Sequence, residues 1–136
     1  MPRYKLTIEY DGRPFVGWQI QDNGPSVQGV LAAAVEAFCG QKVSVHGAGR
    51  TDAGVHALGQ VANFYSALTI PDAKLLGAIN AHLSDDLVAL AVEPAPQLFD
   101  ANRDAVRKKY RYVIHDGPIL SPFMRRYACH SRHPLD

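Results

Sequence analysis

The chain has 136 residues, a formal net charge of +1 and 47% hydrophobic residues, a composition typical of one globular domain with a hydrophobic core. It contains no apolar run near the roughly 20 residues of a membrane-spanning helix, and its first residues lack the apolar stretch of a secretory signal. These features exclude a helical membrane protein, and we expect a cytoplasmic protein without membrane association.

The first predicted elements are a strand, a helix and two further strands. Residues 3–12 alternate apolar and polar side chains before an Asp-Gly turn, which predicts a strand. Residues 25–40 carry apolar side chains at helical spacing, between a serine N-cap and a glycine stop. Residues 41–49 predict a short strand that enters a glycine-rich loop, and residues 55–66 resume a strand pattern.

The remaining predicted elements are a helix and two strands. Residues 72–83 have helical spacing, and residues 85–93 form a nearly continuous apolar strand that we expect to be covered on both faces. Residues 107–116 alternate again and predict a final strand. The order β-α-β-β-α-β, plus this extra strand, predicts an α+β, ferredoxin-like fold with an antiparallel sheet and its helices on one face.

Two features suggest how the chain is organised. Residues 1–115 are predicted to form the ferredoxin-like domain, whereas residues 116–136 have proline breaks and little periodicity and predict a connection toward a second α/β half. Residues 1–100 hold six Lys/Arg and ten Asp/Glu, a net charge of −4, and residues 101–136 hold eight and three, a net charge of +5. This asymmetry indicates either a site for a polyanion or an ordinary solvated charged face.

The segment GAGRTDAGVHA, residues 47–57, combines three glycines with an arginine, an aspartate and a histidine. It is no Walker loop, because Val55 stands where a lysine is required, and no dinucleotide fingerprint, because Asp52 holds the third glycine position. Two interpretations remain, a plain turn or a loop that presents Asp52 to a substrate. The second gains support because Arg50 is near enough in sequence to pair with Asp52 and keep it ionised.

Residues 47–61, GAGRTDAGVHALGQV, resemble the signature of the tRNA pseudouridine synthases of the TruA family. Further segments of the chain resemble family segments in the family's order, so the resemblance covers essentially the whole chain. These segments are residues 10–21, 26–31, 79–83 and 108–112. It implies an isomerase that converts uridine to pseudouridine at positions 38–40 of the tRNA anticodon stem-loop, without a metal or organic cofactor. It also implies two α/β halves with a basic cleft between them, and a cytoplasmic homodimer.

The resemblance assigns roles to three residues. Asp52 matches the catalytic aspartate, acting either as a nucleophile on ribose C1′ or as a base that removes the 2′ proton. Arg50 matches the arginine that pairs with this aspartate and helps to displace the target base from its stack. Tyr110 matches the tyrosine that packs on the uracil, although its alternating strand suits a core aromatic equally well. We expect Tyr112 to lie in the core.

Other residues have weaker assignments. Trp18 either stacks on RNA or packs under the loop, and His56 either contacts the substrate or forms a structural hydrogen bond. Asn102 stands where many family members carry an arginine, so one RNA contact is lost or moves to Arg103. The remaining expected RNA contacts are basic side chains that bind phosphate: Arg107, Lys108, Lys109 and Arg111.

The cysteines and histidines of the chain do not favour a disulfide framework or a metal site. Cys39 and Cys129 stand far apart in no CxxC pattern, which excludes a disulfide framework, and Cys129, His130 and His133 lack the fourth ligand of a zinc site. A non-catalytic RNA-binding module remains open, as does a nucleoside or sugar-phosphate enzyme, although the basic end favours a larger polyanion. We expect the chain to be a truncated form that is weakly active or inactive by itself.

Overall fold

The computed structural model describes residues 2–67 and 70–135, which divide into two compact units. The larger unit ends at Ala105 and the smaller begins at Val106. The predicted boundary at residue 115, and the predicted connection over residues 116–136, stay predictions.

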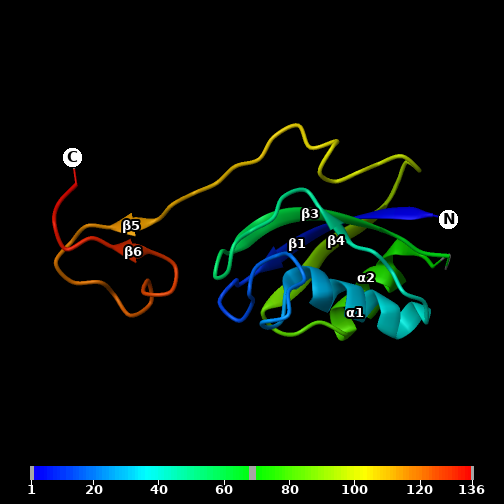
Figure 1. Cartoon of the computed structure of the whole chain (residues 1–136), viewed down its shortest axis with the longest axis horizontal. Helices are drawn as coiled ribbons and strands as arrows, with labels where there is room; N and C mark the ends of the chain where they lie inside the picture. The colour runs from blue at the N-terminus through cyan, green and yellow to red at the C-terminus, as the bar shows by residue number, and fades with distance from the viewer. Residues whose placement is uncertain (1, 68–69, 136) are drawn as a thin grey trace. The chain divides into compact units, whose positions relative to one another are not determined.

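The larger unit is a four-stranded antiparallel sheet with two helices on one face (Figure 1). The strand order is β2-β3-β1-β4, which is the ferredoxin-like arrangement and confirms the predicted fold class. Both described helices are too short to cross a membrane. The elements are β1 (Arg3–Tyr10), α1 (Val27–Cys39), β2 (His46–Gly47), β3 (Ala57–Tyr65), α2 (Asp72–Ala81) and β4 (Leu87–Ala95).

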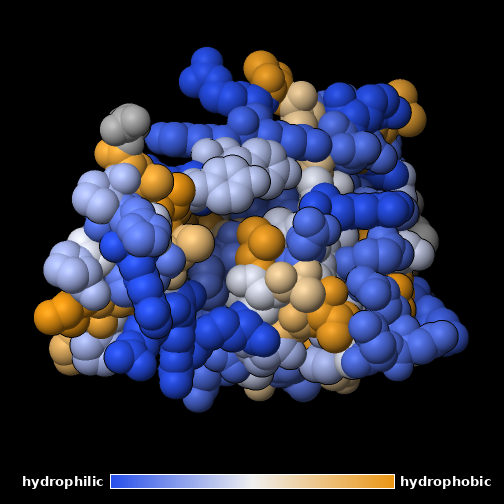
Figure 2. All heavy atoms as spheres, turned by 60° about the vertical axis from the view of Figure 1, so that its left-hand side comes forward, coloured by the Kyte–Doolittle hydropathy of each residue, from blue (hydrophilic) through white to orange (hydrophobic). Residues whose placement is uncertain are grey.

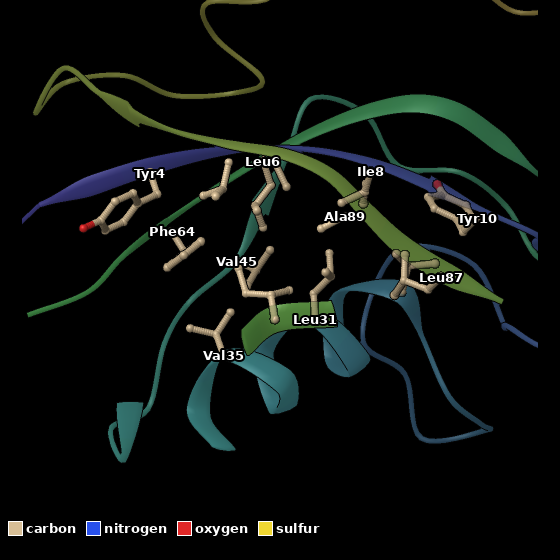
Figure 3. Packing of buried hydrophobic residues seen from close by; sticks show 14 of the residues in the cluster. Tyr4, Leu6, Ile8, Tyr10, Leu31, Val35, Val45, Phe64, Leu87 and Ala89 are labelled. Carbon is tan, nitrogen blue, oxygen red and sulfur yellow. The ribbon is translucent and has the colours of Figure 1, made fainter. Parts of the chain in front are cut away.

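The core lies between β1 and the helices. Alternate residues of β1 point toward α1 because successive side chains of a strand face opposite sides (Figure 3). Helix α1 begins where the Ser26 hydroxyl accepts a 3.0 Å hydrogen bond from Gly29 N, and it ends at Gly40 in the left-handed conformation. The central cluster, all fully or nearly fully buried, comprises Tyr4, Leu6, Ile8, Tyr10, Leu31, Val35, Phe64 and Leu87.

Strand β4 differs from the prediction, because only one of its faces is covered. Leu87 and Ala89 are buried beneath the helices, while Val88 and Leu90 are 38% and 48% exposed. β4 is an edge strand of an antiparallel sheet whose helices lie on one side, so no helix covers the face that carries Val88 and Leu90. On the face in Figure 2, apolar side chains reach the surface as separate groups among hydrophilic ones.

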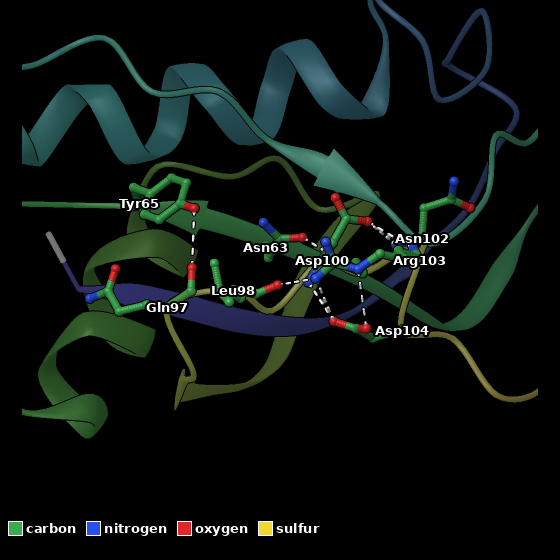
Figure 4. A network of polar contacts seen from close by, with 9 residues as sticks. Asn63, Tyr65, Gln97, Leu98, Asp100, Asn102, Arg103 and Asp104 are labelled. Atoms are coloured by element: carbon green, nitrogen blue, oxygen red, sulfur yellow. Dashed lines mark hydrogen bonds and ion pairs between the residues drawn. The ribbon is translucent and has the colours of Figure 1, made fainter.

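The chain after β4 folds back onto the sheet face opposite the helices. The side-chain oxygen of Asn63, which is 1% exposed, accepts a 2.8 Å hydrogen bond from the backbone N–H of Ala101 (Figure 4). Asp100 accepts hydrogen bonds from the backbone N–H groups of Asn102 and Arg103 at 2.9 and 2.8 Å. These bonds stabilise a compact turn over residues 98–104 and hold the pKa of Asp100 below its ordinary value, with the Arg103 N–H as the main cause.

The smaller unit contains two short parallel strands, β5 (Ile114–His115) and β6 (Cys129–His130). The predicted strand over residues 107–116 was therefore too long, since only its last part has strand geometry. A strand requires a neighbour for its backbone hydrogen bonds, and in the described chain residues 107–113 lie in no ladder. The prediction that Tyr112 is a core residue was also wrong, because its side chain is 89% exposed.

Candidate active-site loop

Asp52 occupies the first position of a tight turn between β2 and β3. The backbone N–H of Val55 donates a 3.1 Å hydrogen bond to the carbonyl oxygen of Asp52. Gly54, at the third position, has φ +81°, and Ala53 is not among the residues with positive φ. This combination defines a type II turn, in which glycine is the residue that adopts the third position without strain. We call residues 52–55 the Asp52 turn.

Thr51 anchors the Asp52 turn on its N-terminal side. Its hydroxyl lies 2.8 Å from the hydroxyl of Tyr10, and its carbonyl oxygen accepts a 2.9 Å hydrogen bond from the backbone N–H of Trp18. The backbone also passes so close to Gly17 that a Cβ there would lie 2.7 Å from the Thr51 carbonyl oxygen. The residue before Asp52 is thus held by the segment that follows β1.

His56 anchors the turn on its other side. Its Nδ1 accepts a 2.9 Å hydrogen bond from the backbone N–H of Gly12, which is buried. A Cβ on Gly12 would clash with the carbonyl group of Val55, so only glycine permits this approach. The structural hydrogen bond is therefore the interpretation of His56 that the geometry favours. The side chain keeps 28% of its surface exposed.

Asp11 and Arg13 form an ion pair beside His56. Arg13 Nε lies 2.9 and 3.0 Å from the two carboxylate oxygens of Asp11, and Nη2 lies 2.6 Å from Oδ2. These side-chain hydrogen bonds are the main reason that the pKa of Asp11 lies well below its ordinary value, while partial burial opposes them. Asp11 Oδ1 is also 3.3 Å from His56 Nδ1.

The structure does not contain the predicted ion pair between Arg50 and Asp52. Both residues are exposed, and among the described residues no hydrogen bond or ion pair joins their side chains. The loop therefore presents a solvent-accessible carboxylate on a backbone that is held at both ends.

Trp18 does not lie on the surface. Its side chain is 2% exposed and packs beneath the loop, so the structure favours core packing over stacking on RNA. The sequence did not reveal the other residues that hold the Asp52 turn in place, which are Tyr10, Gly12, Gly17 and Thr51. The only available signal was the spacing of glycines near residues 10–21, since each contact joins residues more than 30 positions apart.

The remaining residues predicted to contact RNA lie partly in the larger unit and partly in the smaller unit. Asn102 is exposed, whereas the guanidinium group of Arg103 contacts the carbonyl of Leu98 and lies 3.4 Å from Asp104 Oδ2, within the turn of Figure 4. Arg103 therefore has a structural partner at the position to which the RNA contact was expected to move. The candidate residues in the smaller unit are all exposed, and Tyr110 is 64% exposed; they are Arg107, Lys108, Lys109, Tyr110 and Arg111.

No group of three His, Cys, Asp or Glu side chains suited to a metal ion occurs within residues 2–67 and 70–135. The ring of His130 lies 5.7 Å from that of His115, and each ring contacts a backbone carbonyl instead: His130 Nε2 lies 2.7 Å from Gly117 O, and His115 Nε2 lies 2.8 Å from Ile119 O.

Comparison with known proteins identifies a family. A family sequence model described as tRNA pseudouridine synthase matches residues 6–103. Proteins named tRNA pseudouridine synthase A from Rhodopseudomonas palustris and Nitrobacter hamburgensis are 61% and 58% identical over 115 residues, covering 84% of this chain and 46% and 47% of their own lengths. One from Allorhizobium ampelinum is 49% identical over 139 residues, covering all of this chain and 54% of its own length. The chain thus spans about half the length of the curated relatives it matches.

Proposed function

Because this chain belongs to the tRNA pseudouridine synthase family, we propose that it carries the catalytic loop of an isomerase that converts uridine to pseudouridine in tRNA. The observation that supports this most directly is the exposed carboxylate of Asp52 on a turn held at both Thr51 and His56. Catalysis requires such a group to be accessible to the substrate and fixed in position.

The reaction moves one bond of the nucleoside. The bond from uracil N1 to ribose C1′ breaks, the base turns, and C5 joins to C1′, while the hydrogen on C5 leaves as a proton and N1 takes up a proton in place of its bond to C1′. In its ionised form Asp52 either attacks C1′ or takes the ribose 2′ proton, and an accessible carboxylate suits both steps. Arg50, exposed on the same loop, is proposed to displace the base, and Tyr110 to pack on the uracil.

The wider biological assignment rests on the family resemblance. We propose that the substrate is the tRNA anticodon stem-loop at positions 38–40, that the complete protein is a cytoplasmic homodimer, and that a second α/β half forms the other wall of a basic cleft. Arg107, Lys108, Lys109 and Arg111 are proposed to contact phosphate, so binding should weaken as salt rises.

The test measures tritium released from a tRNA transcript made with [5-³H]uridine, because pseudouridine formation removes the C5 hydrogen. The chain is tested by itself and within a chimera in which it replaces the matching segment of the Rhodopseudomonas palustris relative. Asp52→Asn is compared with Asp85→Asn, an exposed aspartate in the turn before β4. We expect the chimera to release tritium, Asp52→Asn to abolish release, and Asp85→Asn to release as the parent does.

Two outcomes would contradict the proposal. Equal release from the parent and Asp52→Asn would remove Asp52 from the chemistry. A folded chimera that binds tRNA and releases nothing, beside an active unmodified relative, would favour a binding module instead.

A further inference from the structure

We infer that His56 is a positioning residue for Asp52, acting through the backbone of the Asp52 turn and not through the substrate. This inference deepens the proposed function and rests on it. It begins from the hydrogen bond that Gly12 N donates to His56 Nδ1, which ties the residue directly after the turn to the segment after β1.

The direction of this hydrogen bond determines the form of the imidazole ring. A backbone N–H is always a donor, so the Nδ1 that accepts it carries no hydrogen, and the neutral ring holds its hydrogen on Nε2. The neighbouring carboxylate of Asp11 lies 3.3 Å from the same Nδ1 and would compete for it if the ring were protonated there. Arg13 binds both oxygens of that carboxylate, which reduces the competition and leaves Nδ1 to Gly12.

The backbone around His56 is tightly constrained. Gly12 is buried, and the carbonyl of Val55 occupies the place of its missing Cβ, so the two segments are in direct backbone contact. Thr51 holds the other end of the turn through Tyr10 and Trp18. If the His56 side chain is lost, the C-terminal side of the turn is held only by the strand pairing of Ala57 with Tyr10, and the Asp52 carboxylate samples a wider range of positions. Small displacements of a catalytic group reduce its rate by as much as about 100-fold.

The alternative is that His56 contacts RNA directly through its exposed edge. Two substitutions separate the possibilities, because they place a polar atom at different points. The amide oxygen of asparagine is bonded to Cγ, as Nδ1 is, whereas the amide of glutamine lies one bond farther out and approximates Nε2. Both side chains are neutral amides, so a difference between them reports the position of the acceptor.

Steady-state kinetics of the chimera provide the first readout. We expect His56→Ala and His56→Gln to lower kcat by about 10- to 100-fold with KM changed by less than about threefold, and His56→Asn to recover most of kcat. A direct RNA contact predicts the opposite pattern, in which glutamine restores activity, asparagine does not, and KM rises.

Hydrogen exchange in the 136-residue chain provides a second readout that needs no activity. The Gly12 amide should exchange at least about tenfold faster in His56→Ala and His56→Gln than in the parent, and should stay slow in His56→Asn. His82→Ala, on the C-cap of α2, is the matched control and should leave Gly12 unchanged. Unchanged Gly12 exchange in His56→Gln would overturn the inference. The expected exchange pattern, together with a folded chimera that never forms pseudouridine beside an active unmodified relative, would instead contradict the proposed function alone.

Discussion

The indole ring of Trp18 fills the space that a side chain at position 47 would need. A Cβ on Gly47 would lie 2.6 Å from two ring carbons of Trp18, and Trp18 itself is 2% exposed. The backbone of β2 thus rests directly on an aromatic ring, immediately before the Asp52 loop begins.

This contact predicts that Gly47→Ala destabilises the protein by about 1–3 kcal/mol, because neither the ring nor the strand has room to move. Urea unfolding measures the free energy of unfolding. Gly59→Ala in β3 is the control, since a Cβ there meets no atom within 4 Å, and it should change stability by less than about 0.5 kcal/mol. Equal stability of the two variants would show that the Trp18 contact is not tight in solution.

A second prediction concerns Gly54, whose constraint is conformational and not steric. Nothing lies within 4 Å of a Cβ there, but its φ of +81° is unfavourable for residues with side chains. We expect Gly54→Ala to cost about 1–2 kcal/mol and Gly54→Asn to cost less, because asparagine tolerates the left-handed region. Thermal unfolding of both variants checks the order. The type II assignment fails if alanine is as stable as glycine.

A third prediction concerns Asn63, which joins β3 to the turn after β4. Asn63→Ala leaves the buried N–H of Ala101 without its acceptor, so unfolding should become easier by about 1–3 kcal/mol. Exchange of the Ala101 amide should also become faster. Asn23→Ala, at an exposed position before α1, is the control. If the two variants unfold alike, the turn is not held by Asn63.

The fourth prediction follows from the lowered pKa of Asp11. Arg13→Gln removes the hydrogen bonds that favour the carboxylate, so the pKa of Asp11 should rise toward the ordinary value of about 3.9. A carboxyl whose pKa is depressed in the folded state adds stability above its unfolded pKa, and this is lost as pH falls through the folded value. The parent should therefore exceed Arg13→Gln in stability above about pH 4, and the difference should vanish in stronger acid.

The size of that difference should be small and should decrease with added salt, since Arg13 is partly exposed. Carbon-13 titration of the Asp11 carboxyl measures the pKa directly. Lys42→Gln, an exposed basic residue at another site, should leave the titration of Asp11 as it is in the parent. A rise in the Asp11 pKa in that variant would point to general electrostatics and not to Arg13.

Local patterns predicted the larger unit well. Alternation in residues 3–12 identified β1, and the serine and glycine signals bounded α1 within a residue or two. The same reasoning failed for residues 107–113, because alternation describes the two faces of a strand but does not supply a neighbouring strand. It failed for β4 because an apolar run does not reveal whether one face or two are covered.

In the candidate site, too, some features could be predicted from local sequence and others could not. Asp52 was identified from its residue type, its glycine-rich context and its resemblance to a family. Closeness in sequence and the resemblance both predicted a pairing with Arg50, but among the described residues no hydrogen bond or ion pair joins the two side chains. His56 had two open interpretations until the structure brought Gly12 to its Nδ1, across 44 positions of the chain.

Local patterns in the chain were sufficient to predict the order of the elements and to identify the family, because periodicity, caps and motifs are properties of neighbouring residues. The folded chain was needed to see that the segment after β1 holds Thr51 and His56 on either side of Asp52, and that Trp18 lies under Gly47. Those contacts depend on the antiparallel pairing of β1 with β3, which brings the residues after one strand beside the residues before the other. No local pattern contains that pairing.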